Sequence, residues 1–403
     1  MKRTAPRTAE IQPFVVMDVL ARAKALEARG RRVIHMEIGE PDFTATPQVV
    51  AAAVRALREG KSAYTPALGL PKLRKAIARH YENAFSRKIS PERIAVTSGA
   101  SGGLLLAIAA YVGPGDEVLV PDPGYPGYRH LVRAFEGRAR ALKVSAATNF
   151  QPTLAMVRAA WGPRTRGLVL GSPSNPTGTI ISGNELKQIA RFVAARRGVL
   201  IADEIYQELV YGRAPATALG LPGEVVVINS FSKYFCMTGW RLGWVVLPAS
   251  RNNARVREFE KLAQHLAICA PSIAQHAALK CFSRGSKRIL EARRAEFERR
   301  RDFLVPALRR AGLEVPAPPT GAFYVYARIP ARVARDGRRF ALELLERAGV
   351  AATPGVDFGA NGTKRTVRFA YTRSMADLKE AARRLARLRA ARPLRRRRRA
   401  SAA

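Results

Sequence analysis

Residues 225–244 read VVVINSFSKYFCMTGWRLGW. The run at 225–228 has the β-branched composition of a buried strand, and the segment after it places Lys233 among aromatic side chains. A buried amine is costly because removal from water disfavours its charged form, unless a partner or a chemical function compensates. This lysine therefore indicates a site, and Ser230 and Arg241 on either side of it are candidate partners.

Similar apolar runs recur through the first part of the chain and alternate with helical patterns. Five such runs are predicted to be strands, at residues 94–97, 117–120, 167–170, 199–202 and 225–228. Between them lie longer stretches with apolar residues at helical spacing, for example 184–196. Strands that alternate with helices are typical of a mostly parallel sheet covered by helices on both faces. The sequence therefore predicts an α/β fold.

The pattern changes after residue 251. A long charged helix is predicted at 287–310, followed by short strands at 323–327 and 367–371, which is typical of a smaller α+β domain. The first expected unit is an N-terminal arm at 1–46 that forms part of the small domain. A large cofactor-binding domain follows at 47–289, then a small C-terminal domain at 290–391 and a basic, disordered tail at 392–403.

Polar residues follow several of the predicted strands. In an open α/β sheet, ligands bind beyond the carboxyl ends of the strands, so these residues should lie together. The glycine-rich loop at 98–103 opens a helix and offers backbone N–H groups to an anion, although a plain tight turn explains it equally well. Two prolines fix the direction of Asn175, and Asp203 and Tyr206 follow the strand at 199–202.

Together these groups are a desolvated lysine, a carboxylate, an amide, a phenol and an anion cradle that Ser230 and Arg241 complete. Desolvation lowers the pKa of a lysine and leaves a neutral amine that can form a Schiff base with an aldehyde. Pyridoxal 5'-phosphate has an aldehyde, a phosphate, a ring nitrogen and a ring hydroxyl, and so uses every member of the set. The residues therefore favour a pyridoxal phosphate site.

Three motifs in order carry a resemblance to a known family. They are SNPTG at 174–178, DEIY at 203–206, and SFSK followed by GWRLG within 230–243. The chain resembles the class I/II aminotransferases of the fold-type I, aspartate-aminotransferase-like superfamily, from about Pro13 to about Ala391. The resemblance implies an enzyme that exchanges amino and keto groups between an L-amino acid and a 2-oxo acid by a ping-pong mechanism.

The resemblance also implies a role for each residue of the sheet edge. Lys233 would form the aldimine with the cofactor and then, as general base and acid, move the substrate's Cα proton. Asp203 would pair with the pyridinium N–H. Asn175 and Tyr206 would bind the ring oxygen, and Tyr125 would stack on the ring. The remaining cofactor-binding residues would be Ser98, Gly99, Ala100, Ser101, Ser230 and Arg241.

Three further matches lie outside the sheet. Gly39 resembles the residue whose backbone meets the substrate carboxylate, beside Asn175. Arg368 resembles the arginine that grips this carboxylate through two parallel hydrogen bonds. Tyr64 resembles a tyrosine that reaches the phosphate of the neighbouring subunit, which implies a homodimer with shared active sites.

Several of these residues have purely structural alternatives. Arg368 could be one more surface residue among 69 lysines and arginines, Tyr125 a core residue, and Tyr64 a tyrosine at the rim. The five histidines are unclustered, so no metal site is expected.

The net charge of +38 is the unusual feature of the composition. Residues 381–403 hold ten arginines, and the charge without them is still +28, so the excess is global. A basic tail can bind nucleic acid by counterion release, but no zinc, helix-turn-helix or RNA-binding signature accompanies it. We therefore interpret the arginines as solvated surface and expect no nucleic-acid partner.

The three cysteines are too few and too scattered for a disulfide framework, which favours a reducing compartment. No signal-peptide core is present, and no apolar run approaches the ~20 residues that span a bilayer. We therefore expect a cytoplasmic protein without a membrane partner.

Two other functions are compatible with the same motifs. The scaffold could run a pyridoxal-phosphate-dependent elimination, since the fold and cofactor do not fix the reaction. The other is a DNA-binding regulator with an aminotransferase-like domain, although the chain before Pro13 is too short to hold a DNA-binding domain. As for substrate, some bacterial aspartate specialists of the family place a lysine where this chain has Ser101, so neutral or apolar amino donors are expected.

Overall fold

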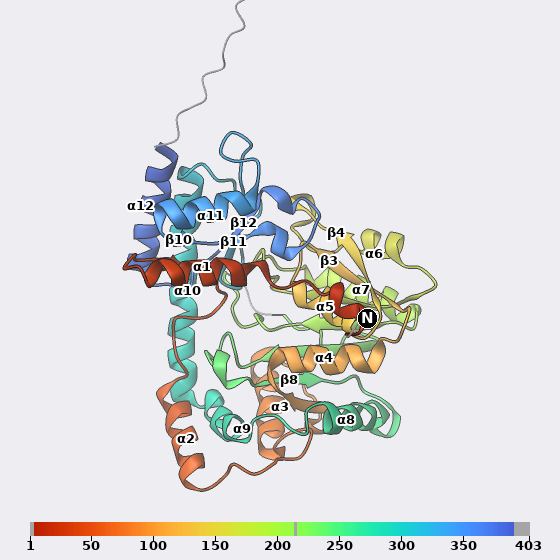
Figure 1. The fold of residues 1–403 in the computed structure, drawn as a ribbon. Helices are drawn as coiled ribbons and strands as arrows, with labels where there is room; N and C mark the ends of the chain where they lie inside the picture. Colours follow the sequence, from red (N-terminus) through yellow and green to blue (C-terminus); the bar gives the residue numbers. More distant parts are fainter. Residues whose placement is uncertain (1–3, 213–215, 391–403) are drawn as a thin grey trace, which may run out of the picture.

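The computed structural model describes residues 4–212 and 216–390 (Figure 1). A seven-stranded sheet with its helices forms the larger part. A smaller part, with α1 (Val15–Glu27), α11 (Gly337–Ala348) and α12 (Met375–Ala390), lies at the top of Figure 1. The long helix α10 (Arg284–Arg310) runs along one side and joins the two. The predicted tail at 392–403 lies outside the described residues.

The large sheet has the strand order β2-β8-β7-β6-β5-β3-β4. Its strands, in that order, are Ile94–Thr97, Gly243–Val246, Glu224–Ser230, Val199–Asp203, Thr165–Gly171, Glu117–Asp122 and Arg138–Lys143. The pairs from β7 through to β4 are parallel, whereas β8 is antiparallel to both β2 and β7. The carboxyl ends of all strands but β8 therefore meet at one edge.

Alternate residues of the central strands enter two different cores. On β6, Leu200 and Ala202 belong to the cluster that includes Ile189 of α7 (Gly183–Ala195). Val199 and Ile201 belong to the cluster that α4 (Gly99–Tyr111) helps to form. Burial on both faces explains why the strands read as continuous apolar runs. The predicted α/β fold with helices on both faces is confirmed.

The remaining helices surround this sheet. They are α2 (Pro47–Arg58), α3 (Pro71–Phe85), α5 (Pro126–Ala134), α6 (Leu154–Ala160), α8 (Ala254–Leu266) and α9 (Ser272–Ala278). The helices α2, α3 and α5 open on a proline and α4 opens on Gly99, so the sequence marks where these helices begin.

The smaller part contains two short sheets. One has the antiparallel order β11-β12-β9, formed by Thr353–Pro354, Thr366–Ala370 and Tyr324–Arg328. The other pairs β1 (Ile34–His35) with β10 (Val350–Ala351). The N-terminal arm therefore contributes a strand to the smaller part.

Two strands of the large sheet were missed by the sequence analysis. The strand β8 begins at Gly243, the last residue of the GWRLG motif, with no helical pattern between the two to mark a new element. The edge strand β4 reads RARALK and has only one buried residue, so it lacks an apolar run. The strand β8 runs antiparallel to both of its neighbours, and β4 is one of the two edge strands of the sheet.

No helix within the described ranges combines the length and the apolar character that a membrane crossing requires.

Candidate active site

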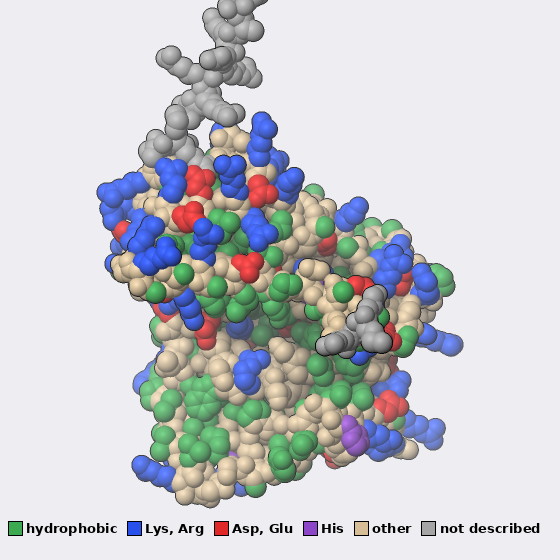
Figure 2. Space-filling view, viewed as in Figure 1, with side chains coloured by type: hydrophobic (Ala, Val, Ile, Leu, Met, Phe, Trp, Pro, Cys, Tyr) green, Lys and Arg blue, Asp and Glu red, His purple; other side chains and the backbone are tan. Residues whose placement is uncertain are grey.

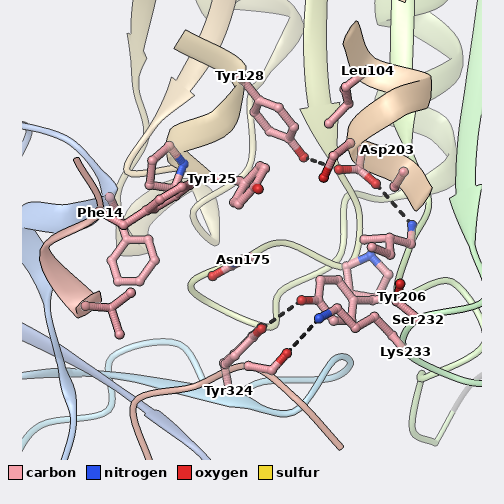
Figure 3. Close-up of a pocket in the computed structure, with 18 of the residues that line it drawn as sticks. Phe14, Leu104, Tyr125, Tyr128, Asn175, Asp203, Tyr206, Ser232, Lys233 and Tyr324 are labelled. Carbon is pink, nitrogen blue, oxygen red and sulfur yellow. Dashed lines mark hydrogen bonds between the residues drawn. The ribbon is translucent and has the colours of Figure 1, made fainter. Parts of the chain in front are cut away.

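A cavity of about 250 Å³ lies at the carboxyl edge of the large sheet (Figure 3). Its walls come from the strand ends of this sheet, from β9 and β12 of the smaller part, and from the N-terminal arm. Ten residues that the sequence predicts for a site line it, namely Gly39, Ala100, Ser101, Tyr125, Asn175, Asp203, Tyr206, Lys233, Arg241 and Arg368.

Four predicted residues are not on the cavity wall. Ser98 and Gly99 form the N-terminus of α4 directly beside it. Ser230 is buried and donates a hydrogen bond of 2.9 Å to Ser232, which lines the cavity instead. Tyr64 is 81% exposed on the outside of the molecule.

The amine of Lys233 crosses the cavity from the large sheet to the N-terminal arm. Its Nζ donates a hydrogen bond of 2.6 Å to the carbonyl oxygen of Gly39. Loss of hydration lowers the pKa of this amine to about 8, although the Glu40 carboxylate opposes the shift. Only glycine fits at position 39, because a Cβ there would lie 1.9 Å from the Tyr324 hydroxyl.

The loop that carries Lys233 has a constrained backbone. Cys236 and Arg241 both adopt left-handed conformations, with φ of 55° and 51°. Residues other than glycine rarely adopt such angles, and they cluster where a site fixes the position of a side chain.

Asp203 lies at the end of β6, buried beside the cavity. It accepts a hydrogen bond of 2.7 Å from the Tyr128 hydroxyl and one of 3.2 Å from the backbone N–H of Ile205. Desolvation raises the pKa of this carboxyl to about 6, and the Tyr128 hydrogen bond opposes the shift. A buried carboxylate in this setting gains from a cationic N–H donor.

Aromatic side chains form much of the remaining wall. The Tyr206 hydroxyl hydrogen-bonds the Tyr324 hydroxyl at 2.7 Å. Tyr125 packs edge-on against Tyr128, and its other neighbour is Phe14, whose ring stacks with it at 6.3 Å between centroids (Figure 3). Desolvation, followed by the charge of Asp203, raises the pKa of the Tyr125 hydroxyl to about 12.

Arg241 and the N-terminus of α4 form one corner of the cavity. A Cβ at Gly99 would lie 2.6 Å from Arg241 Nη2, so glycine allows the guanidinium to approach the helix end. The N-cap residue of α4, Ser98, makes no side-chain capping bond, which leaves the helix N–H groups to a ligand. A cation beside a helix N-terminus is suited to bind a phosphate.

Arg368 on β12 is nearly fully buried and faces the cavity from the smaller part. Its Nη1 donates to Asn175 Oδ1 at 2.8 Å, and its Nη2 donates to the Glu37 carbonyl at 2.5 Å and to Thr353 Oγ1 at 3.2 Å. The guanidinium also lies over the Tyr324 ring, 4.3 Å from its centroid. Its Nε has no hydrogen-bond partner among the described residues.

Eleven of the residues that line the cavity were absent from the predicted site, and five of them are Phe14, Tyr128, Ser232, Tyr324 and Asp357. Tyr128 lies three residues after Tyr125 at the start of α5, so helical spacing could have indicated it. Ser232 is next to Lys233 in the chain. The other three come from the N-terminal arm and the smaller part. No local sequence pattern indicates where these segments lie relative to the sheet.

These groups fit pyridoxal phosphate. The buried Asp203 carboxylate suits the ring N–H, the desolvated Lys233 amine suits the aldehyde, and the Gly99–Arg241 corner suits the phosphate. The Arg368 guanidinium, which faces the cavity, suits a substrate carboxylate. Within residues 4–212 and 216–390, no group of three or more His, Cys, Asp and Glu side chains could hold a metal ion.

Comparison with known proteins gives the same assignment. The family model for aminotransferase class I and II matches residues 31–385. The chain is 38% identical to the valine–pyruvate aminotransferase of Mycobacterium tuberculosis, over 94% of this chain and 96% of that protein. It is 37% identical to the (5-formylfuran-3-yl)methyl phosphate transaminase of Methanocaldococcus jannaschii, over 93% and 96% of the two chains.

Solved structures agree with these relatives. An aminotransferase from Mycobacterium tuberculosis superposes with a TM-score of 0.91 at 37% identity, covering 97% of this chain and all of the other. The resemblance inferred from the three sequence motifs is thereby confirmed. The chain belongs to the class I and II aminotransferases, enzymes that transfer amino groups with the help of pyridoxal phosphate.

Proposed function

We propose that the enzyme exchanges amino and keto groups between an L-amino acid and a 2-oxo acid by a ping-pong route, with Lys233, Asp203 and Tyr206 as its catalytic residues. The observation that carries this proposal is the position of the Lys233 amine, which is partly buried and lines one cavity with Asp203 and Arg368. Both relatives named above are transaminases, which favours transamination over the lyase and DNA-binding alternatives.

When bound, pyridoxal phosphate supplies an aldehyde and an electron-withdrawing ring. Asp203 holds the proton on the ring nitrogen, because a buried carboxylate stabilises the charged N–H. Asn175 uses its Oδ1 to accept from Arg368, which leaves its amide N–H groups to donate to the ring oxygen beside Tyr206. Tyr125 would cover the ring face. The Arg241 corner would hold the phosphate together with Ser98, Gly99, Ala100, Ser101 and, through the loop, Ser230.

The substrate carboxylate would bind the guanidinium of Arg368, which lines the cavity, near the backbone of Gly39 and the amide of Asn175. Three contacts from Asn175, Glu37 and Thr353 hold the guanidinium in place before the substrate arrives. Lys233, as a neutral amine, would take the proton from the substrate Cα and deliver it to the cofactor carbon that carried the aldehyde, and its lowered pKa favours this neutral form.

A homodimer with shared active sites is part of this proposal. On α2, Val50, Val54 and Leu57 recur at helical spacing and are 43%, 41% and 61% exposed. Apolar atoms gather over this part of the molecule at the lower left of Figure 2. Tyr64 follows α2 and is 81% exposed. An apolar face of this kind is typical of a subunit interface, which would bring Tyr64 to the cofactor phosphate of the partner subunit.

We further propose that the arm at 1–46 acts with the small domain at 290–391, and that 47–289 forms the cofactor-binding domain. The pairing of β1 with β10 supports the first assignment. A cytoplasmic location is also proposed, because all three cysteines are free.

Replacement of Lys233 by alanine should abolish transamination, with kcat reduced by at least about a thousandfold, because the proton-transfer group is lost. The variant should still fold and bind the cofactor noncovalently, since Asp203 and Arg241 remain. Stopped-flow and steady-state kinetics test the first point, and cofactor content after gel filtration tests the second. Substantial turnover by this variant would refute the assignment of Lys233.

Subunit mixing tests the shared site. A Tyr64→Ala variant and a Lys233→Ala variant should each have low activity, because each lacks a component of every site. Heterodimers formed from them contain one site with both lesions and one with neither, so activity should recover. Mass spectrometry must show that subunits have exchanged. No recovery in such a sample would mean that Tyr64 does not serve the neighbouring site.

A panel of amino donors tests the substrate class. Neutral donors such as alanine, methionine and aromatic amino acids should have the higher kcat/KM, because the Ser101 hydroxyl cannot balance a distal carboxylate. A preference for aspartate of ~100-fold over every neutral donor, about 2.7 kcal/mol of differential binding, would show instead that a distal cation exists.

A further inference from the structure

One wall of the cavity is built around a carboxylate that the proposed reaction does not use. Asp357 lies in the short 3-10 helix η7 (Gly355–Phe358), is 4% exposed and lines the cavity beside Phe358. From the N-terminal arm, Phe14 and Val16 line the cavity as well. These four residues are therefore a mainly apolar wall with one acid in it.

Asp357 holds this wall together. Its Oδ1 accepts a hydrogen bond of 2.7 Å from the backbone N–H of Val15, the first residue of α1. The N-cap residue of α1 is Phe14, which has no side chain that can cap the helix, so Asp357 supplies the cap from another segment. The Asp357 carbonyl accepts a hydrogen bond of 2.9 Å from Arg129 of α5, which ties the wall to the large sheet.

The charge of this carboxylate reaches the cavity. It contributes to the raised pKa of the Tyr125 hydroxyl, after the larger effects of desolvation, Asp203 and Tyr324. Desolvation also raises the pKa of Asp357 itself, while its bonds to the α1 terminus and the charges of Arg368 and Arg129 oppose that shift. The cations that interact with Asp357 are thus Arg368, which is assigned to the substrate carboxylate, and Arg129, which donates to the Asp357 carbonyl.

The wall lies next to Arg368, to which the proposed function assigns the substrate carboxylate. A substrate whose carboxylate is on Arg368 and whose amine is at Lys233 has its side chain left to the rest of the lining. The Arg368 guanidinium lies 4.9 Å from the centroid of the Phe358 ring, so this wall adjoins the carboxylate site. Of the described residues that line the cavity, the only Lys or Arg side chains are Lys233, Arg241 and Arg368, and each has a role already.

We propose that Asp357 determines the substrate class: it holds the apolar wall of Phe14, Val16 and Phe358 against the substrate side chain and repels a second carboxylate there. The inference rests on the proposed function, since it takes the Arg368 and Lys233 assignments as given. The enzyme then accepts 2-amino acids with uncharged apolar or aromatic side chains and discriminates against aspartate and glutamate by repulsion as well as by the lack of a cation.

Binding of two substrate analogues to the cofactor-loaded enzyme tests this proposal without turnover. Isothermal titration calorimetry should show 4-methylpentanoate binding at least about tenfold more tightly than glutarate to the wild type. Asp357→Asn removes the charge but keeps an oxygen that can cap α1. It should reduce this ratio about tenfold or more and change the affinity for 4-methylpentanoate less than about threefold.

Two further variants separate the charge from the cap. Asp357→Ala loses both, so binding of 4-methylpentanoate should also weaken, because the wall is no longer held. Asp18→Asn removes an exposed acid from the first turn of the same helix, outside the cavity lining, and should leave the ratio unchanged. Thermal melting of each variant checks that the fold is intact.

The outcomes distinguish this proposal from the proposed function. An unchanged ratio in a folded Asp357→Asn variant, or wild-type glutarate binding as tight as that of 4-methylpentanoate, would overturn the role of Asp357 alone. If neither carboxylate binds the wild type, the carboxylate site at Arg368 is wrong, and the proposed function fails with it.

Discussion

The partial removal of the Lys233 amine from water is the constraint on which the rest of the site depends. It requires a strand that delivers the lysine to the sheet edge, a constrained loop that directs it, and an opposite wall that closes over it. The hydrogen bond to the Gly39 carbonyl supplies that closure, because it joins the lysine of the large sheet to the N-terminal arm. A neutral amine can act as nucleophile and base, whereas a hydrated ammonium cannot.

The buried ionisable groups around the cavity follow the same logic. Desolvation raises the pKa of Asp203 and lowers that of Lys233, so each disfavours its own charge until a ligand supplies the opposite one. Arg368 is held by a side-chain amide, a backbone carbonyl and a hydroxyl, with no carboxylate in contact, so its charge is left for a substrate. The site is thus prepared for an anionic substrate and a protonated ring before either is bound.

The sequence indicated those parts of the site that follow strands. The strands β5, β6 and β7 are apolar runs, and Asn175, Asp203 and Lys233 each lie within a few residues of the end of one of them, so the common edge brings them together. Tyr324 and Asp357 were not predictable in this way. They reach the cavity through the packing of the smaller part against the sheet, and their own segments carry no signal of that contact. The edge strand β4 was missed because three of its six residues are basic and only one is buried, so it contains no continuous apolar run.

The most direct test of this account is the pKa of the Lys233 amine in the cofactor-free protein. Competitive acetylation followed by mass spectrometry measures the reactivity of each lysine as a function of pH. The account predicts half-maximal reactivity of Lys233 near pH 8, well below the ordinary value of 10.5, because the neutral form of a lysine with a lowered pKa appears at lower pH. Reactivity of Lys233 that rises only near pH 10, together with that of the exposed lysines, would contradict it.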